Sequence, residues 1–242
     1  MAARRGFWAR AGRALLWLAG LFVVLSVLAV LALRFIAPPA TAFMLNAQAS
    51  AWLEHDPHWR LDYRWTPYER ISRHVKLAVI ASEDQKFAFH PGFDFEAIDQ
   101  AIKERERGKR LRGASTISQQ VAKNLFLWPG QSFVRKGFEA YFTLLIEWLW
   151  PKQRILEVYL NVAEWGPGVY GIGAAAPRFF HTDPAHVDQS QAALLAVALP
   201  NPIRLRVDRP GPYMLRRQAW VIEQMNELGG TAYIRGVDGA AR

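Results

Sequence analysis

The stretch ASEDQKFAFHPGFD, residues 81–94, places two adjacent carboxylates, Glu83 and Asp84, directly after an apolar run. Charged side chains seldom end an apolar run unless the run ends at the surface or at a functional site. The simplest interpretation is a helix that ends at the surface with Phe87 buried, because Gly92 argues against a continuing helix. The alternative is that Glu83 is a general acid or base whose pKa is tuned by apolar neighbours and by Asp84.

The spacing of apolar residues predicts a mainly helical protein. Long alternating patterns typical of strands are absent, there is no internal repeat, and only residues 63–65 are expected to form a short extended piece. One helix should begin at a capping box made by Thr116 and Gln119, and Pro129-Gly130 should prevent it from continuing. The predicted helices span residues 70–85, 95–107, 116–127, 132–150, 152–162, 189–199 and 214–228.

Composition narrows the class of protein. The chain has 242 residues, of which 51% are hydrophobic, so one good-sized domain with an appendage is expected. It has no cysteine, which excludes a disulfide framework and a thiolate metal site. The formal net charge is +9, but five arginines lie in the first 34 residues, which contain no acid. Nucleic acid is therefore not the expected partner.

An apolar segment near the N-terminus predicts a membrane anchor. Residues 14–33, ALLWLAGLFVVLSVLAVLAL, carry no charge, and about 20 such residues in a helix span the ~30 Å hydrocarbon core of a bilayer. Four arginines precede the segment and only Arg34 follows, which predicts a cytoplasmic N-terminus. A cleaved signal peptide is the alternative, but the segment is long and RFIAPPATAF is a poor cleavage site. We therefore expect a cytoplasmic basic tail (1–13), a transmembrane anchor (14–36) and an external domain (37–242).

Two further stretches carry candidate chemistry. In RKGFE, residues 135–139, Glu139 lies four residues after Arg135, and an ordinary ion pair on a helix is the simplest interpretation. In GASTISQQVAKN, residues 113–124, hydroxyls, glutamines, Lys123 and an asparagine gather within three helical turns. A solvated polar helix would explain this pattern, but it also suits a bound sugar or phosphate. The charged run KERERGKRLRG, residues 103–113, is typical of a solvated loop, and beside a membrane it could contact headgroups or a pyrophosphate.

The order of these stretches resembles the family-51 peptidoglycan glycosyltransferases. These enzymes polymerise lipid II, and they also form the N-terminal module of class A penicillin-binding proteins. The resemblance covers residues 53–213 and leaves no room for a transpeptidase domain, so the monofunctional form is expected. It is carried by EDQKFAFHPGFD (83–94), GASTISQQVAKN (113–124), RKGFE (135–139), KQRILEVYLN (152–161) and GVYGIGAAAPRFF (168–180), with ALPNP (198–202) as a further common element.

The resemblance implies roles for two carboxylates. Glu83 would be the general base that removes the proton from the 4-hydroxyl of the acceptor's GlcNAc. That oxygen would attack the anomeric carbon of MurNAc in the growing strand, so that undecaprenyl pyrophosphate leaves and the configuration inverts. Glu139 would lie near the leaving pyrophosphate, where it could hold a divalent cation, Mg²⁺ or Mn²⁺, or orient basic residues. No tightly bound cofactor is expected, and no metal ligand is certain.

The remaining family positions imply binding and support. Lys123, Arg135 and Lys136 would stabilise the departing pyrophosphate. The groove would be lined by Ser115, Thr116, Gln119, Gln120 and Asn124, and the loops would be fixed by Asp84, Phe87, His90, Tyr159 and Asn161. The last block departs from the family pattern, with Phe179-Phe180 for the usual tyrosine and phenylalanine, and with Pro177 and His181. These departures lie away from both glutamates and cast little doubt on activity.

The family also implies a setting. The fold would be a lysozyme-like, two-lobed glycosyltransferase domain behind one transmembrane helix, on the periplasmic side of the bacterial inner membrane. Its partners would be lipid II, the growing glycan strand and the bilayer, with other cell-wall synthases or division proteins as neighbours. Two alternatives are a lysozyme-like lytic enzyme and an inactive membrane-tethered scaffold.

Overall fold

The computed structural model describes residues 2–107 and 115–239, and the chain divides into two compact units, Met1–Pro38 and Pro39–Arg242. The first unit contains the long helix α1 (Ala2–Phe35). Within the described residues, Gly12–Phe35 is the one helical stretch long and apolar enough to cross a membrane, with a mean hydropathy of 2.8. This stretch coincides with the predicted anchor, and it supports a membrane span by length and composition only.

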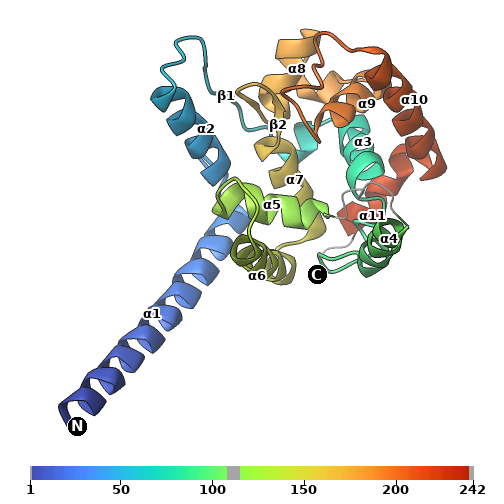
Figure 1. The fold of residues 1–242 in the computed structure, drawn as a ribbon. Coiled ribbons are helices and arrows are strands. Elements are labelled where there is room, and N and C mark those ends of the chain that lie inside the picture. Colours follow the sequence, from blue (N-terminus) through green and yellow to red (C-terminus); the bar gives the residue numbers. More distant parts are fainter. Residues whose placement is uncertain (1, 108–114, 240–242) are drawn as a thin grey trace. The chain divides into compact units, whose positions relative to one another are not determined.

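The second unit is built from two packed groups of helices (Figure 1). In one group α3 (Arg73–Glu83) packs on α9 (Gln189–Ala198), which packs on α10 (Pro212–Glu227). In the other, α5 (Ile117–Phe126) packs on both α6 (Phe133–Leu149) and α7 (Lys152–Val162). The remaining helices are α2 (Ala42–Leu53), α4 (Phe95–Glu106), α8 (Ile172–Phe180) and α11 (Ile234–Gly239), with short 3-10 turns at Tyr68–Arg70, Pro184–His186 and Gly230–Tyr233.

A small three-stranded sheet lies beside α7 and α8. Its order is β1 (Asp62–Tyr63), β3 (Val169–Tyr170) and β2 (Glu164–Gly166), with β1 parallel and β2 antiparallel to the central β3. Asp62 pairs with Val169, and Tyr63 pairs with Tyr170. The sheet thus connects the segment before α3 to the loop after α7.

Helix α3 fixes the position of Glu83. The Ser72 hydroxyl accepts a hydrogen bond from the backbone N–H of His74 at 3.2 Å and so caps the N-terminus of the helix. Every residue from Val75 to Ala81 is buried, so the helix is held firmly by the core. Asp84 leaves the helical conformation, with φ −161° and ψ 74°, and the helix therefore ends at Glu83.

The helical fold class is confirmed, and all seven predicted helices are present. The predicted start at residue 70 is wrong, because Tyr68–Arg70 forms a 3-10 turn, Ile71 is extended and Ser72 caps α3. The capping box of Thr116 and Gln119 is confirmed. Residues 108–113 of the charged run, with Gly113 and Ala114 of the next block, lie outside the described residues. The likeness to lysozyme stays a prediction.

Gly173 tests how closely α8 packs against the segment that contains Arg64 and Thr66. A Cβ at this position would overlap the backbone carbonyl oxygen of Arg64 and would lie 2.6 Å from Thr66 Oγ1. We expect Gly173→Ala to destabilise the domain by about 1–3 kcal/mol, as overpacking does, in chemical unfolding experiments. Gly137→Ala on α6 is the matched control. A Cβ there meets nothing within 4 Å, so this change should raise stability by roughly 0.5–1 kcal/mol. Equal effects of the two changes would contradict the close approach.

Candidate active site

A cleft of about 370 Å³ opens where four elements meet. The end of α3 supplies Glu83, and the start of α5 supplies Thr116. Helices α4 and α10 supply the other walls, so the cleft lies at the junction of the two helix groups. Its polar lining residues are Ser82, Glu83, Asp84, Gln85, Asp94, Gln100, Glu104, Ser115, Thr116 and Gln224, and Trp220 is its aromatic residue.

Glu83 is held at the cleft by an oriented amide. Gln120 Nε2 donates a hydrogen bond to Glu83 Oε2 at 2.8 Å, and the hydroxyl of Tyr159 donates to Gln120 Oε1 at 3.2 Å. Burial raises the pKa of Glu83 above its ordinary value. The hydrogen bond from Gln120 and the charges of Arg217 and Lys123 oppose that rise, whereas Asp84 adds to it. A carboxylate with a raised pKa is a stronger base than a solvated one, which suits proton abstraction.

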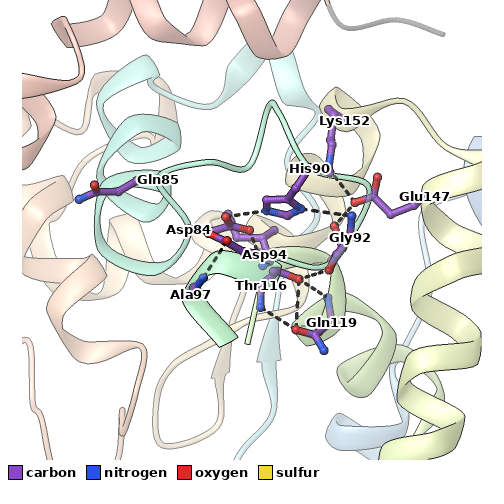
Figure 2. Close-up of polar contacts among 12 residues, drawn as sticks. Asp84, Gln85, His90, Gly92, Asp94, Ala97, Thr116, Gln119, Glu147 and Lys152 are labelled. Carbon is purple, nitrogen blue, oxygen red and sulfur yellow. Dashed lines mark hydrogen bonds and ion pairs between the residues drawn. The ribbon is translucent and has the colours of Figure 1, made fainter. Parts of the chain in front are cut away.

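Asp84 joins three backbone segments, as Figure 2 shows. Its Oδ1 is 2.8 Å from His90 Nε2, and its Oδ2 accepts the N–H of Ile117 at 3.0 Å. His90 Nδ1 accepts the N–H of Gly92 at 3.2 Å, so in the neutral ring the proton lies on Nε2 and is donated to Asp84. Asp84 and His90 are both buried. Their role in fixing the loop stays a prediction.

Thr116 and Gln119 lie at the same helix start. The Thr116 hydroxyl donates to Gly92 O at 2.6 Å and accepts the N–H of Gln119, while Gln119 Oε1 accepts the N–H of Thr116 at 3.0 Å. Both side chains are buried and satisfy the N-terminus of α5. Their part in substrate binding stays a prediction. Thr116 and Ser115 line the cleft, and Asn124 is half-buried two turns further along α5.

A cluster of cations surrounds Glu139 on α6. Arg135 Nη1 lies 3.0 Å from Glu139 Oε2, and Lys136 Nζ lies 2.5 Å from Oε1, with the Glu139 side chain only 4% exposed. Burial lowers the pKa of Lys123, while Glu139 and Glu83 raise it and Arg135 and Lys136 lower it further. Within the described part of the chain no ion pair engages Lys123. Its ammonium group is therefore available to a bound anion.

The expected divalent cation has no ready-made site at Glu139. Both carboxylate oxygens contact the cations Arg135 and Lys136. No group of three or more His, Cys, Asp or Glu side chains suitable for a metal occurs within the described ranges 2–107 and 115–239. The described residues therefore do not fit a resident metal ion here, because such ions need several oxygen ligands. Entry of a cation together with a substrate's phosphates stays a prediction.

The other residues predicted to fix the loops, Phe87, Tyr159 and Asn161, are buried in the core. Phe87 is fully buried, and Tyr159 contacts Gln120 as described above. Asn161 Oδ1 accepts the N–H of Thr66 at 2.7 Å, and its Nδ2 donates to Thr66 O at 2.8 Å. Asn161 thereby ties α7 to the segment that leads into α3.

Sequence reasoning missed the contribution of α10. Trp220 and Gln224 line the cleft, and Gln224 Oε1 accepts a hydrogen bond from Gln85 Nε2 at 2.7 Å. The guanidinium of Arg217 lies 3.6 Å from the ring centroid of Trp220. The motif resemblance ends at Tyr213, in the first turn of this helix. The only available signal was that Trp220 and Gln224, four residues apart on a predicted helix, share one face.

The cleft combines a carboxylate of raised pKa with neutral hydrogen-bonding groups, and Lys123 interacts electrostatically with that carboxylate. Such a site belongs to an enzyme that activates a hydroxyl and stabilises a departing anion. A family model described as Transglycosylase matches residues 54–226, and the chain belongs to that family.

Three relatives support this assignment, and each is called a biosynthetic peptidoglycan transglycosylase. The protein from Pseudomonas savastanoi pv. phaseolicola is 50% identical over 95% of both chains. The one from Pseudomonas fluorescens is 50% identical over 98% of this chain and 97% of its own. The one from Xylella fastidiosa is 50% identical over 87% of both.

The charges of the site predict a bell-shaped pH profile. The acidic limb of kcat/KM should lie above the ordinary range of a carboxyl group, because Glu83 must lose its proton and its pKa is raised. The basic limb should lie below the ordinary range of a lysine, because the pKa of Lys123 is lowered. Lys123→Arg keeps the charge at all these pH values, so it should move only the basic limb upward. A basic limb that stays in place would remove Lys123 from this role.

Proposed function

We propose that the protein polymerises lipid II into linear β-1,4-linked glycan strands and releases undecaprenyl pyrophosphate with inversion at the anomeric carbon. The observation that carries the proposal is Glu83, a carboxylate with a raised pKa at the wall of a cleft, oriented by Gln120. Membership of the transglycosylase family and the names of the relatives support the same chemistry.

The first half of the reaction needs a base. Glu83 takes the proton of the GlcNAc 4-hydroxyl while that oxygen forms a bond to the MurNAc anomeric carbon. The amide of Gln120 cannot rotate freely, because Tyr159 donates to its oxygen and its nitrogen donates to Glu83. The base is therefore held in one orientation before the substrate arrives, which lowers the reorganisation needed in the transition state.

The second half needs positive charge. As the bond between the anomeric carbon and the pyrophosphate oxygen breaks, the electron pair remains on the pyrophosphate. Lys123 would receive this charge, and its electrostatic interaction with both Glu139 and Glu83 supports that role. Glu139 pairs with Arg135 and Lys136, so these two cations are oriented before the bond breaks.

One wall of the cleft, here called the sugar wall, is formed by Trp220, Gln85, Gln100 and Gln224 and suits the uncharged sugars. Trp220 presents an aromatic ring, and the amides of Gln85, Gln100 and Gln224 offer donors and acceptors that suit hydroxyl and acetamido groups. One ring of the strand would stack on Trp220 while the amides select its orientation. The cation cluster and the sugar wall thus serve different parts of one substrate.

The anchor suits a substrate that stays in the bilayer. We propose that α1 spans the bacterial inner membrane once, with the basic N-terminus in the cytoplasm and the second unit in the periplasm. Exposed apolar residues of α2, among them Leu45, Trp52 and Leu53, would contact the interface. New strands must be cross-linked, so other cell-wall synthases or division proteins would work beside this enzyme.

The decisive experiment uses full-length protein in detergent with labelled lipid II. We expect a ladder of products that a muramidase digests, and we expect Glu83→Gln to lower the rate by about 10²–10⁴-fold without lowering the Tm. Shortening of preformed strands without a ladder would instead identify a lytic enzyme. Neither activity in the wild-type protein would favour a non-catalytic scaffold.

Trp220 tests the sugar wall separately. Trp220→Ala should raise KM for lipid II about 10-fold, because an aromatic stacking contact contributes roughly 0.5–1.5 kcal/mol beyond burial. Trp220→Phe keeps an aromatic face and should recover most of the loss. If both variants lowered kcat alone, the ring would act through Arg217 rather than through the sugar.

A further inference from the structure

A buried ion pair lies behind the turn that follows α3. Lys152 Nζ, at the start of α7, is 2.7 Å from Glu147 Oε1, near the end of α6, and the two side chains are 10% and 9% exposed. Neither residue lines the cleft that contains Glu83. A buried ion pair adds little net stability, because the cost of removing both charges from water offsets their attraction. The Glu147–Lys152 pair is therefore better explained by its position beside the turn than by a gain in stability.

The pair is bonded to the turn and to α5 at once. Lys152 Nζ donates a second hydrogen bond to the backbone oxygen of His90 at 2.6 Å, as Figure 2 shows. The hydroxyl of Ser118, in the first turn of α5, donates to Glu147 Oε1. A Cβ on Gly92 would lie 2.8 Å from Glu147 Cγ, so the turn is packed directly against this side chain.

From the turn, hydrogen bonds lead to the base. The ring of His90 binds Asp84, the residue next to Glu83, and Asp84 accepts the N–H of Ile117 at the start of α5. Gln120, which donates to Glu83, lies three residues after Ile117 on the same helix. The relative placement of Glu83 and Gln120 thus depends on how the turn is seated between α5, α6 and α7.

We propose that Glu147 and Lys152 are positioning residues that hold the 84–94 turn so that Glu83 stays hydrogen-bonded to Gln120. They act through the His90 carbonyl and through Ser118, without touching the reacting atoms. The kinetic part of the proposal rests on the proposed function, since its readout is the rate of lipid II polymerisation.

The test replaces both charges together. Glu147→Gln/Lys152→Met leaves no lone buried charge, and the new amide oxygen can still accept the Ser118 hydroxyl. We expect kcat to fall about 10²-fold, as a misplacement near 1 Å can cause, with KM changed less than threefold. The acidic limb should also move to higher pH, because the Gln120 hydrogen bond lowers the pKa of Glu83 and would weaken.

A second pair on α7 gives the matched control. Arg154 Nη1 is 2.6 Å from Glu157 Oε2, with side chains 11% and 15% exposed, and Glu157 Oε1 accepts the N–H of Tyr68, which lies outside the 84–94 turn. Arg154→Met/Glu157→Gln should lower the Tm at least as much while kcat stays within twofold of wild type. If the first double variant fails to fold, Glu147→Gln alone should show the same shift of the acidic limb with a smaller loss of kcat.

Two results would overturn the proposal: a kcat within twofold of wild type in Glu147→Gln/Lys152→Met, or an equal loss of kcat in the control. Hydrogen exchange provides a readout that needs no substrate. The Ile117 amide should exchange faster in the first double variant and not in the control. If the wild-type protein makes no glycan, the proposed function fails. The positioning proposal is then decided by exchange, and an unchanged Ile117 amide overturns it.

Discussion

The structure of the site depends on Asp84, the carboxylate next to the proposed base Glu83. Asp84 accepts hydrogen bonds from the His90 ring and from the backbone of Ile117, and it follows Glu83 directly in the chain. A buried carboxylate is stable only when its oxygens are satisfied, and here each oxygen has its own donor. The bridge therefore fixes the end of α3 against the start of α5. The two helix groups meet at this point, and the cleft follows from their meeting.

The site separates two kinds of chemistry by the helices that carry them. Glu83 lies at the end of α3, and the cations lie on α5 and α6 around Glu139. Lys123 interacts electrostatically with both carboxylates, so its charge couples the two regions. The proposed base can therefore keep its raised pKa while the cations on the other helices stabilise the negative charge of the leaving group. The same separation explains why Glu139 pairs with two cations whereas Glu83 accepts a hydrogen bond from the neutral amide of Gln120.

Much of this arrangement could be predicted from the sequence, because the helices carry clear apolar periodicity and the capping box of Thr116 and Gln119 is a local signal. The proposed roles of Glu83 and Glu139 rest on motif resemblance and not on spacing. Helix α8 was missed, since it is a short helix and contains Gly173 and Pro177, two residue types that argue against a helix. Trp220 and Lys152 were missed as site residues because their importance arises from contacts with segments far away in the chain.

The burial of Glu83 also bears on how stable the domain can be. A carboxyl group whose pKa is raised by folding favours the folded state while it is protonated, and this contribution is lost as the pH rises through the raised pKa. The pH at which Glu83 can accept a proton is thus the pH at which it opposes folding. Replacing Glu83 by an uncharged residue would therefore raise the stability of the domain but remove the proposed activity.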